Sequence, residues 1–326
     1  MSIIDMPLDE LKQYKGMSPC PSDFDEFWDK GIREVGMIAP NVEMRPAAFQ
    51  LKGFECYDLF YTSIQNARIH AKVIKPVTSD NLPIAGKLPI ALHFHGYSGR
   101  AYDWNEHLAY AAAGFCVAAM DCRGQAGESE DIGNVKGNTL HGQIIRGLPQ
   151  GKEHLLFRQI FLDTVQLANV MKAMTFTDET RICAFGGSQG GALTMACAAL
   201  VPEVSQLAPM YPFLCDYKRV LKLNIDTGAY IELKEYLRMF DPTYKHFDET
   251  MHTLGYIDIV NFAKRIKGET LLAVTLNDDV CPPSTVYAAY NNIVAKKDIR
   301  IYPHHGHEPL PYFWDEVIQK FQKELC

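Results

Sequence analysis

The sequence predicts an α/β fold in which a mostly parallel sheet is covered by helices on both faces. Short, almost continuous apolar segments alternate along the chain with longer segments of helical periodicity. Strands without polar alternation are buried on both faces, as in parallel sheets whose crossovers are helices. The expected strands are residues 88–96, 114–124, 181–188, 269–278 and 297–307, and the expected helices between them are residues 154–174, 189–200 and 284–294.

Before this alternation lies an N-terminal helical extension, residues 1–40. We expect Ser22 to cap a helix there, because a serine oxygen accepts hydrogen bonds from the free N–H groups of a first turn. Gly36 is expected to end this helix. Two strands should follow at residues 56–63 and 67–76, where the pattern is strand-like.

Residues 211–255 interrupt the alternation of strands and helices. They mix aromatic and charged residues in helical segments and fall between two sheet strands, so we interpret them as a helical insertion that roofs the site. The chain has 326 residues, a length that single α/β domains often reach. We therefore expect one domain over residues 1–326, made of the extension, the sheet with its helices, and the insertion.

The composition excludes several classes of function. The formal net charge of −7 gives neither a basic surface for nucleic acid nor a polybasic attraction to anionic membranes. No secretory signal is recognisable, and no segment reaches the roughly 18 apolar residues that span a bilayer. Nine cysteines occur without a repeated Cys-x-x-Cys spacing, which favours reduced thiols. We therefore expect a cytoplasmic protein without nucleic-acid or membrane partners.

The motif with the clearest chemistry is Gly-x-Ser-x-Gly, which residues 186–190 fit with Ser188 at the centre. An apolar strand runs into an Ala-rich helix here, so the serine lies on the sharp turn between them. The turn needs glycine on both sides because side chains there would clash, and the helix N-terminus adds positive potential near a developing oxyanion. Ser188 is therefore the expected nucleophile of an α/β-hydrolase; the alternative is a glycine-rich turn without chemistry.

A serine nucleophile needs a histidine base and an orienting carboxylate, which follow it in α/β-hydrolases in the order acid, then histidine. The base is expected in the loop after the last strand, where His307 lies deepest. His304 and His305 adjoin the strand and are expected either to pack there or to support the residues of the site. A metal site built from these histidines is the alternative, but no His-Glu-x-x-His or Cys-x-x-Cys motif accompanies them.

The acid is expected after the preceding strand, where Asp278 and Asp279 stand together. Asp278 is preferred because it comes first, and the Pro-Pro pair behind it stiffens the loop. Asp258 is expected instead to cap a helix. The two N–H donors of the oxyanion hole are expected at Gln189, which follows the nucleophile, and at Tyr97, which follows an early strand.

Three motifs go beyond this general pattern: Arg123-Gly124-Gln125, residues 187–191, and His307-Glu308. Together with residues 278–291, they resemble carbohydrate esterase family 7, which contains the acetyl xylan esterases and cephalosporin-C deacetylases. The resemblance covers nearly the whole chain. It implies removal of acetyl groups from small acetylated sugars, xylo-oligosaccharides and cephalosporin C, without a cofactor, by hexamers whose active sites face an internal cavity.

The resemblance implies the same site residues as the motifs: the triad Ser188, Asp278 and His307, and the oxyanion donors Tyr97 and Gln189. Arg123, Gln125 and Glu308 are expected to hold loops near the site and not to contact substrate. Two alternatives stay open. One is a serine peptidase of the prolyl-oligopeptidase kind, which shares the serine turn, and the other is a non-catalytic binding protein on a hydrolase scaffold.

Overall fold

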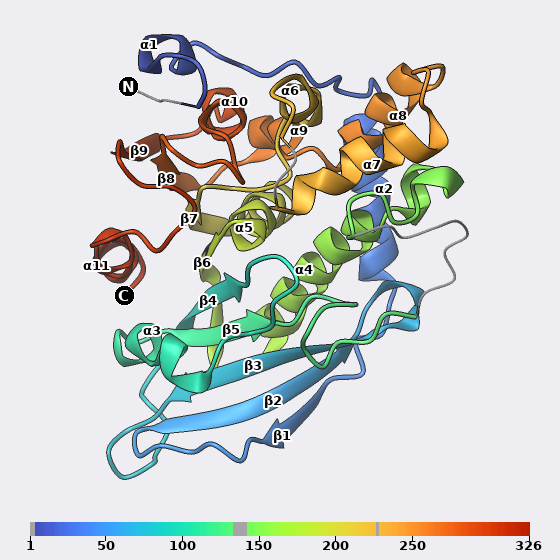
Figure 1. Cartoon of the computed structure of the whole chain (residues 1–326). Coiled ribbons are helices and arrows are strands. Elements are labelled where there is room, and N and C mark those ends of the chain that lie inside the picture. Colours follow the sequence, from blue (N-terminus) through green and yellow to red (C-terminus); the bar gives the residue numbers. More distant parts are fainter. Residues whose placement is uncertain (1–3, 133–141, 226–227) are drawn as a thin grey trace.

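A mixed sheet is the framework of the computed structural model, which describes residues 4–132, 142–225 and 228–326. In these residues the sheet has nine strands in the order β1-β2-β3-β5-β4-β6-β7-β8-β9 (Figure 1). The strands are β1 (Glu43–Pro46), β2 (Phe54–Thr62), β3 (Arg68–Pro76), β4 (Leu88–Phe94), β5 (Cys116–Met120), β6 (Thr177–Gly187), β7 (Val204–Met210), β8 (Glu269–Thr275) and β9 (Lys297–Tyr302). Strands β4 to β9 pair in parallel, whereas β1, β2 and β3 pair antiparallel. The predicted mostly parallel sheet is confirmed.

Helices cover both faces of the parallel strands (Figure 1). Phe185 of β6 stacks against Tyr110 and meets Trp314 and Phe321 edge-on, so α3 and α11 share one face. On the other face, α4 and α5 pack against the central strands. The helices are α1 (Leu8–Leu11), α2 (Phe24–Gly36), α3 (Leu108–Ala112), α4 (Leu156–Ala173), α5 (Gln189–Leu200), α6 (Tyr217–Lys222), α7 (Ile231–Phe240), α8 (Phe247–Leu254), α9 (Ile259–Phe262), α10 (Pro283–Asn292) and α11 (Phe313–Leu325).

The N-terminal extension packs onto the rest of the protein through α2. Trp28 is fully buried, and its ring lies against those of Phe161 and Phe262. Its indole N–H donates to the carbonyl oxygen of Tyr256 at 3.0 Å. The helix ends at Gly36, as the sequence predicts. The apolar face of α2 is therefore part of the core of the protein.

The expected helix cap at Ser22 is wrong. Helix α2 begins at Phe24 with Asp23 at the N-cap position, and no side chain caps it. The carboxylate of Asp23 binds the ammonium of Lys152 at 2.5 Å and the hydroxyl of Tyr256 instead. These tertiary partners compete for the carboxylate with the N–H groups of the first turn, and local sequence does not reveal them.

Helices α6 to α9 connect β7 to β8 and include the segment expected as an insertion. Residues 226–227 of that segment, like residues 1–3 of the extension, lie outside the described residues. Asp258 caps α9 as predicted, because its carboxylate accepts the N–H of Val260 at 3.0 Å. Phe213 and Ala229 of the insertion line the pocket described below.

All nine cysteines lie within the described ranges and are free thiols, and all except Cys20 and Cys326 are buried. The sequence prediction of reduced, buried thiols therefore agrees with the structure. Among the helices of the described residues, none combines the length and hydrophobicity that a bilayer span requires.

Candidate active site

Ser188 lies on the turn between β6 and α5, directly after the strand ends and before the helix begins. Its backbone has φ 57° and ψ −119°, a region that non-glycine residues rarely occupy and that costs on the order of 1–3 kcal/mol. The turn is held on both sides. The Ser188 N–H donates to the carbonyl of Met210 at 3.0 Å, and the Ser188 carbonyl accepts the N–H of Phe213 at 3.0 Å. A strained and well-anchored turn thus carries the predicted nucleophile.

Gly186 and Gly190, the two glycines of the motif, have no room for a side chain. A β-carbon on Gly186 would lie 2.5 Å from the carbonyl oxygen of Phe94, and one on Gly190 would lie closer still to the same atom. Because real β-carbons do not approach a backbone oxygen so closely, either substitution must displace β4 or the turn. The motif therefore reflects the close approach of the serine turn to β4.

The structure brings Ser188, His307 and Asp278 into one hydrogen-bonded series. His307 Nε2 lies 3.1 Å from Ser188 Oγ, and His307 Nδ1 lies 2.9 Å from Asp278 Oδ2. The three residues follow β6, β9 and β8, whose carboxyl ends meet at one edge of the parallel sheet. An imidazole that donates its Nδ1–H to the carboxylate presents a bare Nε2 to the hydroxyl, as a general base must.

Asp278 is fully buried, and its two carboxylate oxygens have different partners. Oδ1 accepts the N–H groups of Val280 at 2.9 Å and Cys281 at 2.7 Å, whereas Oδ2 faces His307. The two backbone donors fix the direction of the carboxylate. Asp279 is exposed, so the geometry supports the choice of Asp278 over its neighbour.

The loop that carries His307 is held by contacts on both sides. The ring of Tyr211 lies against the imidazole with the centroids 4.6 Å apart, and its hydroxyl donates to the carbonyl of Glu308 at 3.0 Å. The Glu308 carboxylate accepts the N–H of Gly306 at 3.0 Å, which closes the turn. Glu308 is exposed, and its carboxylate contact lies within the loop that carries His307.

His304 and His305 lie on the turn between β9 and His307. His304 is exposed, while the carbonyl of His305 accepts the N–H of Asn277 at 3.1 Å. The ring of His305 packs edge-on against Tyr302, with the centroids 5.4 Å apart, which fits a packing role. Within the described residues, no group of three or more His, Cys, Asp or Glu side chains is arranged to hold a metal ion.

The two residues expected to supply the oxyanion donors, Gln189 and Tyr97, lie on segments that are joined by hydrogen bonds. Gln189 is fully buried, and its side-chain amide donates to the carbonyls of His95 at 3.4 Å and Gly96 at 3.5 Å, directly before Tyr97. It also exchanges hydrogen bonds with the amide of Gln125, at 2.8 and 3.1 Å. The Gln189 side chain thus connects α5 to the loop after β4 by hydrogen bonds, and the Gln125 side chain holds the Gln189 amide in place.

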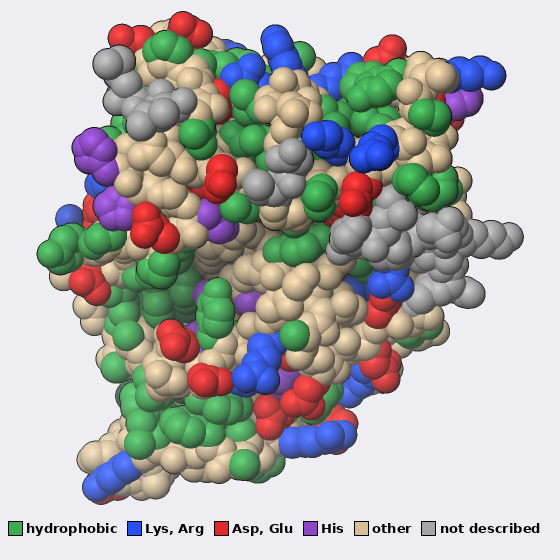
Figure 2. Space-filling model, in the orientation of Figure 1, with side chains coloured by type: hydrophobic (Ala, Val, Ile, Leu, Met, Phe, Trp, Pro, Cys, Tyr) green, Lys and Arg blue, Asp and Glu red, His purple; other side chains and the backbone are tan. Residues whose placement is uncertain are grey.

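A pocket of about 610 Å³ includes Ser188 and His307 in its wall. Figure 2 shows a hollow near the middle of the displayed face, with hydrophobic and histidine side chains beside it. The volume is in the range of sites for small molecules. Most of the large lining side chains are aromatic: Tyr97, Tyr102, Tyr110, Phe185, Tyr211, Phe213 and Trp314.

The family model described as acetyl xylan esterase matches residues 1–325 of this chain. The chain belongs to the acetyl xylan esterase family. The family resemblance inferred from the sequence motifs is thereby confirmed, and so is the predicted α/β-hydrolase fold.

Two solved acetyl xylan esterases match almost all of the chain. The crystal structure of acetyl xylan esterase 1 from Thermoanaerobacterium sp. JW/SL YS485 is 51% identical, with a TM-score of 0.95, and the match covers 99% of this chain and 100% of that one. The acetyl xylan esterase from Paenibacillus sp. R4 is 33% identical, with a TM-score of 0.92 and coverage of 98% and 100%. Acetyl esterase Axe7A of Xylanibacter ruminicola is 28% identical over 293 residues, 88% of this chain, and the match spans 63% of that relative's length.

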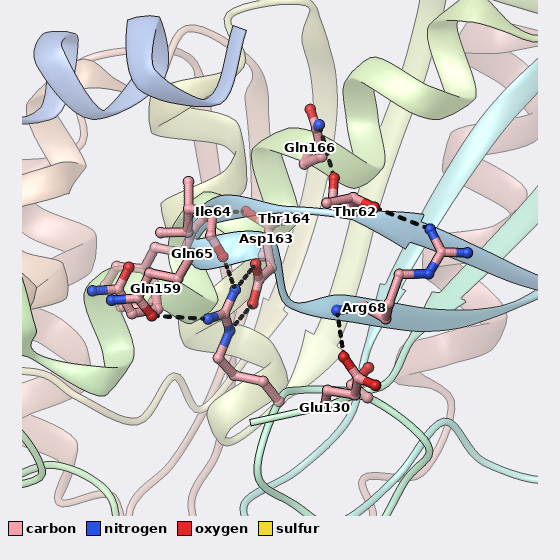
Figure 3. Close-up of polar contacts among 12 residues, drawn as sticks. Thr62, Ile64, Gln65, Arg68, Glu130, Gln159, Asp163, Thr164 and Gln166 are labelled. Atoms are coloured by element: carbon pink, nitrogen blue, oxygen red, sulfur yellow. Dashed lines mark hydrogen bonds and ion pairs between the residues drawn. The ribbon is translucent and has the colours of Figure 1, made fainter. Parts of the chain in front are cut away.

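Arg123 belongs to the first motif that suggested the acetyl xylan esterase family, and it is buried in an ion pair with Asp163 of α4. Its Nε and Nη2 donate to the two carboxylate oxygens at 2.7 and 2.6 Å. The guanidinium also donates to the carbonyl of Ile64 at 3.3 Å and to Gln65 Oε1 at 3.4 Å. Figure 3 shows Asp163 beside Ile64 and Gln65. Arg123 thus joins the loop after β5 to α4 and to the turn after β2, as a structural residue would.

Replacing Arg123 by methionine is expected to lower the free energy of unfolding by about 3–5 kcal/mol, because the Asp163 carboxylate would stay buried without its partner. Urea unfolding at neutral pH measures this change. The matched control is Arg45→Met, because the Arg45 side chain is 59% exposed. Its solvent-exposed ion pair with Glu43 should contribute little to stability, because water screens the two charges. Equal losses in the two variants would contradict the structural role of Arg123.

Proposed function

We propose that this chain is a serine esterase that removes acetyl groups from small acetylated substrates through an acetyl-enzyme. The observation that carries the proposal is the hydrogen-bonded series from Asp278 through His307 to Ser188. The last two of these residues line a pocket of about 610 Å³. Membership of the acetyl xylan esterase family supports it, as does the 51% identity to the Thermoanaerobacterium enzyme.

In the proposed acylation, His307 Nε2 takes the proton of Ser188 as Oγ attacks the acetyl carbon. The N–H groups of Tyr97 and Gln189 stabilise the oxyanion, and each such donor is typically worth about 3 kcal/mol of barrier. His307 then gives the proton to the sugar oxygen, which leaves as an alcohol. Asp278 stabilises the imidazolium and keeps the imidazole in the productive tautomer.

In the proposed deacylation, the same groups act on a water molecule. His307 takes a proton from the water as its oxygen attacks the acetyl-enzyme, and the two N–H donors again hold the oxyanion. The bond from the acetyl carbon to Ser188 Oγ breaks, Oγ recovers its proton from His307, and acetic acid leaves and ionises to acetate in solution. No cofactor is needed in either half.

The proposed substrates are acetylated xylo-oligosaccharides, acetylated monosaccharides and cephalosporin C, the compounds that the family resemblance implies. The aromatic lining of the pocket supports a compact substrate with apolar faces, because aromatic side chains supply large and rigid contact area. From the same resemblance we propose a hexamer, and from the nine free cysteines we propose a cytoplasmic location. Light scattering of the purified protein tests the hexamer.

Acetate release from an acetylated xylo-oligosaccharide, an acetylated monosaccharide and cephalosporin C tests the proposal, with a dipeptide amide assayed beside them. We expect acetate from the acetyl esters and no cleavage of the amide. Faster cleavage of the amide would favour a serine peptidase. Tight binding of the acetylated sugar without any hydrolysis would favour a binding protein.

A further inference from the structure

Glu232 is a fully buried acid that the proposed reaction does not use. It is the second residue of α7, in the insertion. Its Oε1 accepts the hydroxyl of Tyr97 at 3.1 Å and the N–H groups of Gln143 at 3.2 Å and Ile144 at 2.9 Å. Three segments that are far apart in the sequence therefore meet on one oxygen atom.

The phenol of Tyr97 is held from several directions. Its hydroxyl donates to Glu232 and also accepts the N–H of Gln143 at 2.8 Å. Its ring meets Phe213 edge-on, with the centroids 5.4 Å apart, and the N–H of Phe213 donates to the carbonyl of Ser188 at 3.0 Å. The side chain of Tyr97 is thus fixed relative to the proposed nucleophile.

A second series of contacts leads from the same cluster to Gln189. Glu232 binds the backbone of Gln143, whose side-chain oxygen accepts the Gln125 amide at 2.7 Å. The Gln125 amide also donates to Gln189 Oε1 at 2.8 Å. Both residues proposed to supply oxyanion donors, Tyr97 and Gln189, are therefore connected to Glu232.

The cluster around Glu232 is closely packed. A β-carbon on Gly142 would lie 2.8 Å from Glu232 Oε1 and closer still to the Tyr97 hydroxyl. Burial raises the pKa of Glu232 to about 7, and the Ile144 N–H and the Tyr97 hydroxyl oppose this rise by hydrogen-bonding the carboxylate. The hydrogen-bond donors therefore stabilise the Glu232 carboxylate in its buried position. In turn, the carboxylate fixes the position of the Tyr97 hydroxyl.

We propose that Glu232 is a positioning residue for the oxyanion site. It holds Tyr97 by the phenol, and it holds Gln189 through Gln143 and Gln125, so that both N–H donors keep their direction toward the acyl oxygen. The inference rests on the proposed esterase function. Because a donor acts on the charge of the transition state, loss of its alignment should lower kcat and leave KM almost unchanged.

Kinetics of 4-nitrophenyl acetate hydrolysis by Tyr97→Phe, Glu232→Ala and the double variant test this inference. Misplacement by about 1 Å can cost on the order of a hundredfold in rate, so we expect kcat to fall by about tenfold to a hundredfold in Glu232→Ala. Tyr97→Phe should lose about tenfold or somewhat less. Both substitutions remove the same hydrogen bond, from the Tyr97 hydroxyl to Glu232. The kcat of the double variant should therefore be lower than that of Glu232→Ala by no more than about twofold.

Glu232→Gln is expected to restore part of the activity, because the amide keeps an oxygen that can accept a hydrogen bond from the Tyr97 hydroxyl. Its kcat should lie between those of Glu232→Ala and the wild type. The matched control is Glu249→Gln on α8, whose side chain is 79% exposed and which should keep the wild-type kcat. Losses that multiply in the double variant, or a fall confined to melting temperature with kcat intact, would overturn the inference.

Tyr97→Phe keeps the test valid if Glu232→Ala does not fold, because it removes a single oxygen atom. Wild-type kcat in Tyr97→Phe would overturn the inference on its own. The wild-type protein separates this inference from the function on which it rests. If the wild type hydrolyses the ester and Tyr97→Phe equals it, only the role of Glu232 fails; if the wild type does not hydrolyse it, both proposals fail.

Discussion

The Ser188→Ala variant is expected to hydrolyse 4-nitrophenyl acetate with a kcat lower by on the order of 10⁴–10⁶-fold. It lacks the oxygen that lies 3.1 Å from His307 Nε2, so the base has no nucleophile to activate. The pocket and the oxyanion donors stay in place, which leaves a small rate above the uncatalysed reaction. Steady-state kinetics with a protein-free blank measure the loss.

Ser205→Ala is the matched control for Ser188→Ala, because Ser205 lies on β7 and its hydroxyl donates to the backbone carbonyl of Ile182 at 3.3 Å. It should keep the wild-type kcat. Near-ultraviolet circular dichroism shows whether each variant is folded. Substantial turnover in a folded Ser188→Ala protein would place the nucleophile elsewhere.

Asp278→Asn is expected to lower kcat by about 10⁴-fold. The N–H groups of Val280 and Cys281 point at Oδ1, so the amide oxygen must take that position and the NH₂ group must face His307. The amide would then donate to Nδ1, and the imidazole would carry its proton on Nε2, toward Ser188. In that tautomer His307 cannot accept the proton of the nucleophile.

Asp279→Asn is the control for this substitution, because it makes the same chemical change at the adjacent, exposed position. Its kcat should stay within about twofold of the wild type, since surface changes away from reacting groups have small effects. The KM of Asp278→Asn should change little, because the carboxylate acts on the base and not on the bound ester. Similar losses in both variants would contradict the assignment of Asp278.

The sequence was sufficient to predict the three side chains of the proposed triad, which the structure brings together, because each follows an apolar strand. Parallel strands end at one edge of the sheet, so Ser188, Asp278 and His307 meet there although up to 119 residues separate them. Helix α5 begins and ends where the pattern predicts, at Gln189 and Leu200. The glycines of the motif around Ser188 are needed because the serine turn lies close to the backbone of β4, so the sequence motif reveals this contact.

Strands β1 and β7 were missed for local reasons. Strand β7 reads VSQLAPM, in which Gln206 and Pro209 break the apolar run, although its residues are mostly buried. Strand β1 has only four residues, is largely exposed and lies at the edge of the sheet, so it carries no hydrophobic pattern. Both strands exist because of their pairing with neighbours, which a single sequence does not reveal.

The partners of the predicted structural residues could not be read from the sequence either. Asp163 lies inside α4, between Leu162 and Thr164 and 40 residues from Arg123. Glu232 follows an isoleucine in a segment of mixed charge, 135 residues from Tyr97. A carboxylate within a helical segment was the only available signal, and its burial and its partners became evident only from the three-dimensional arrangement of the segments.

Peptide mapping after reaction with a fluorophosphonate probe tests the central claim most directly, because such probes attach to an activated serine oxygen. The account predicts one label per chain, on Ser188, with loss of acetyl ester hydrolysis in proportion to labelling. A label on another residue, or hydrolysis that persists when Ser188 is fully labelled, would contradict it.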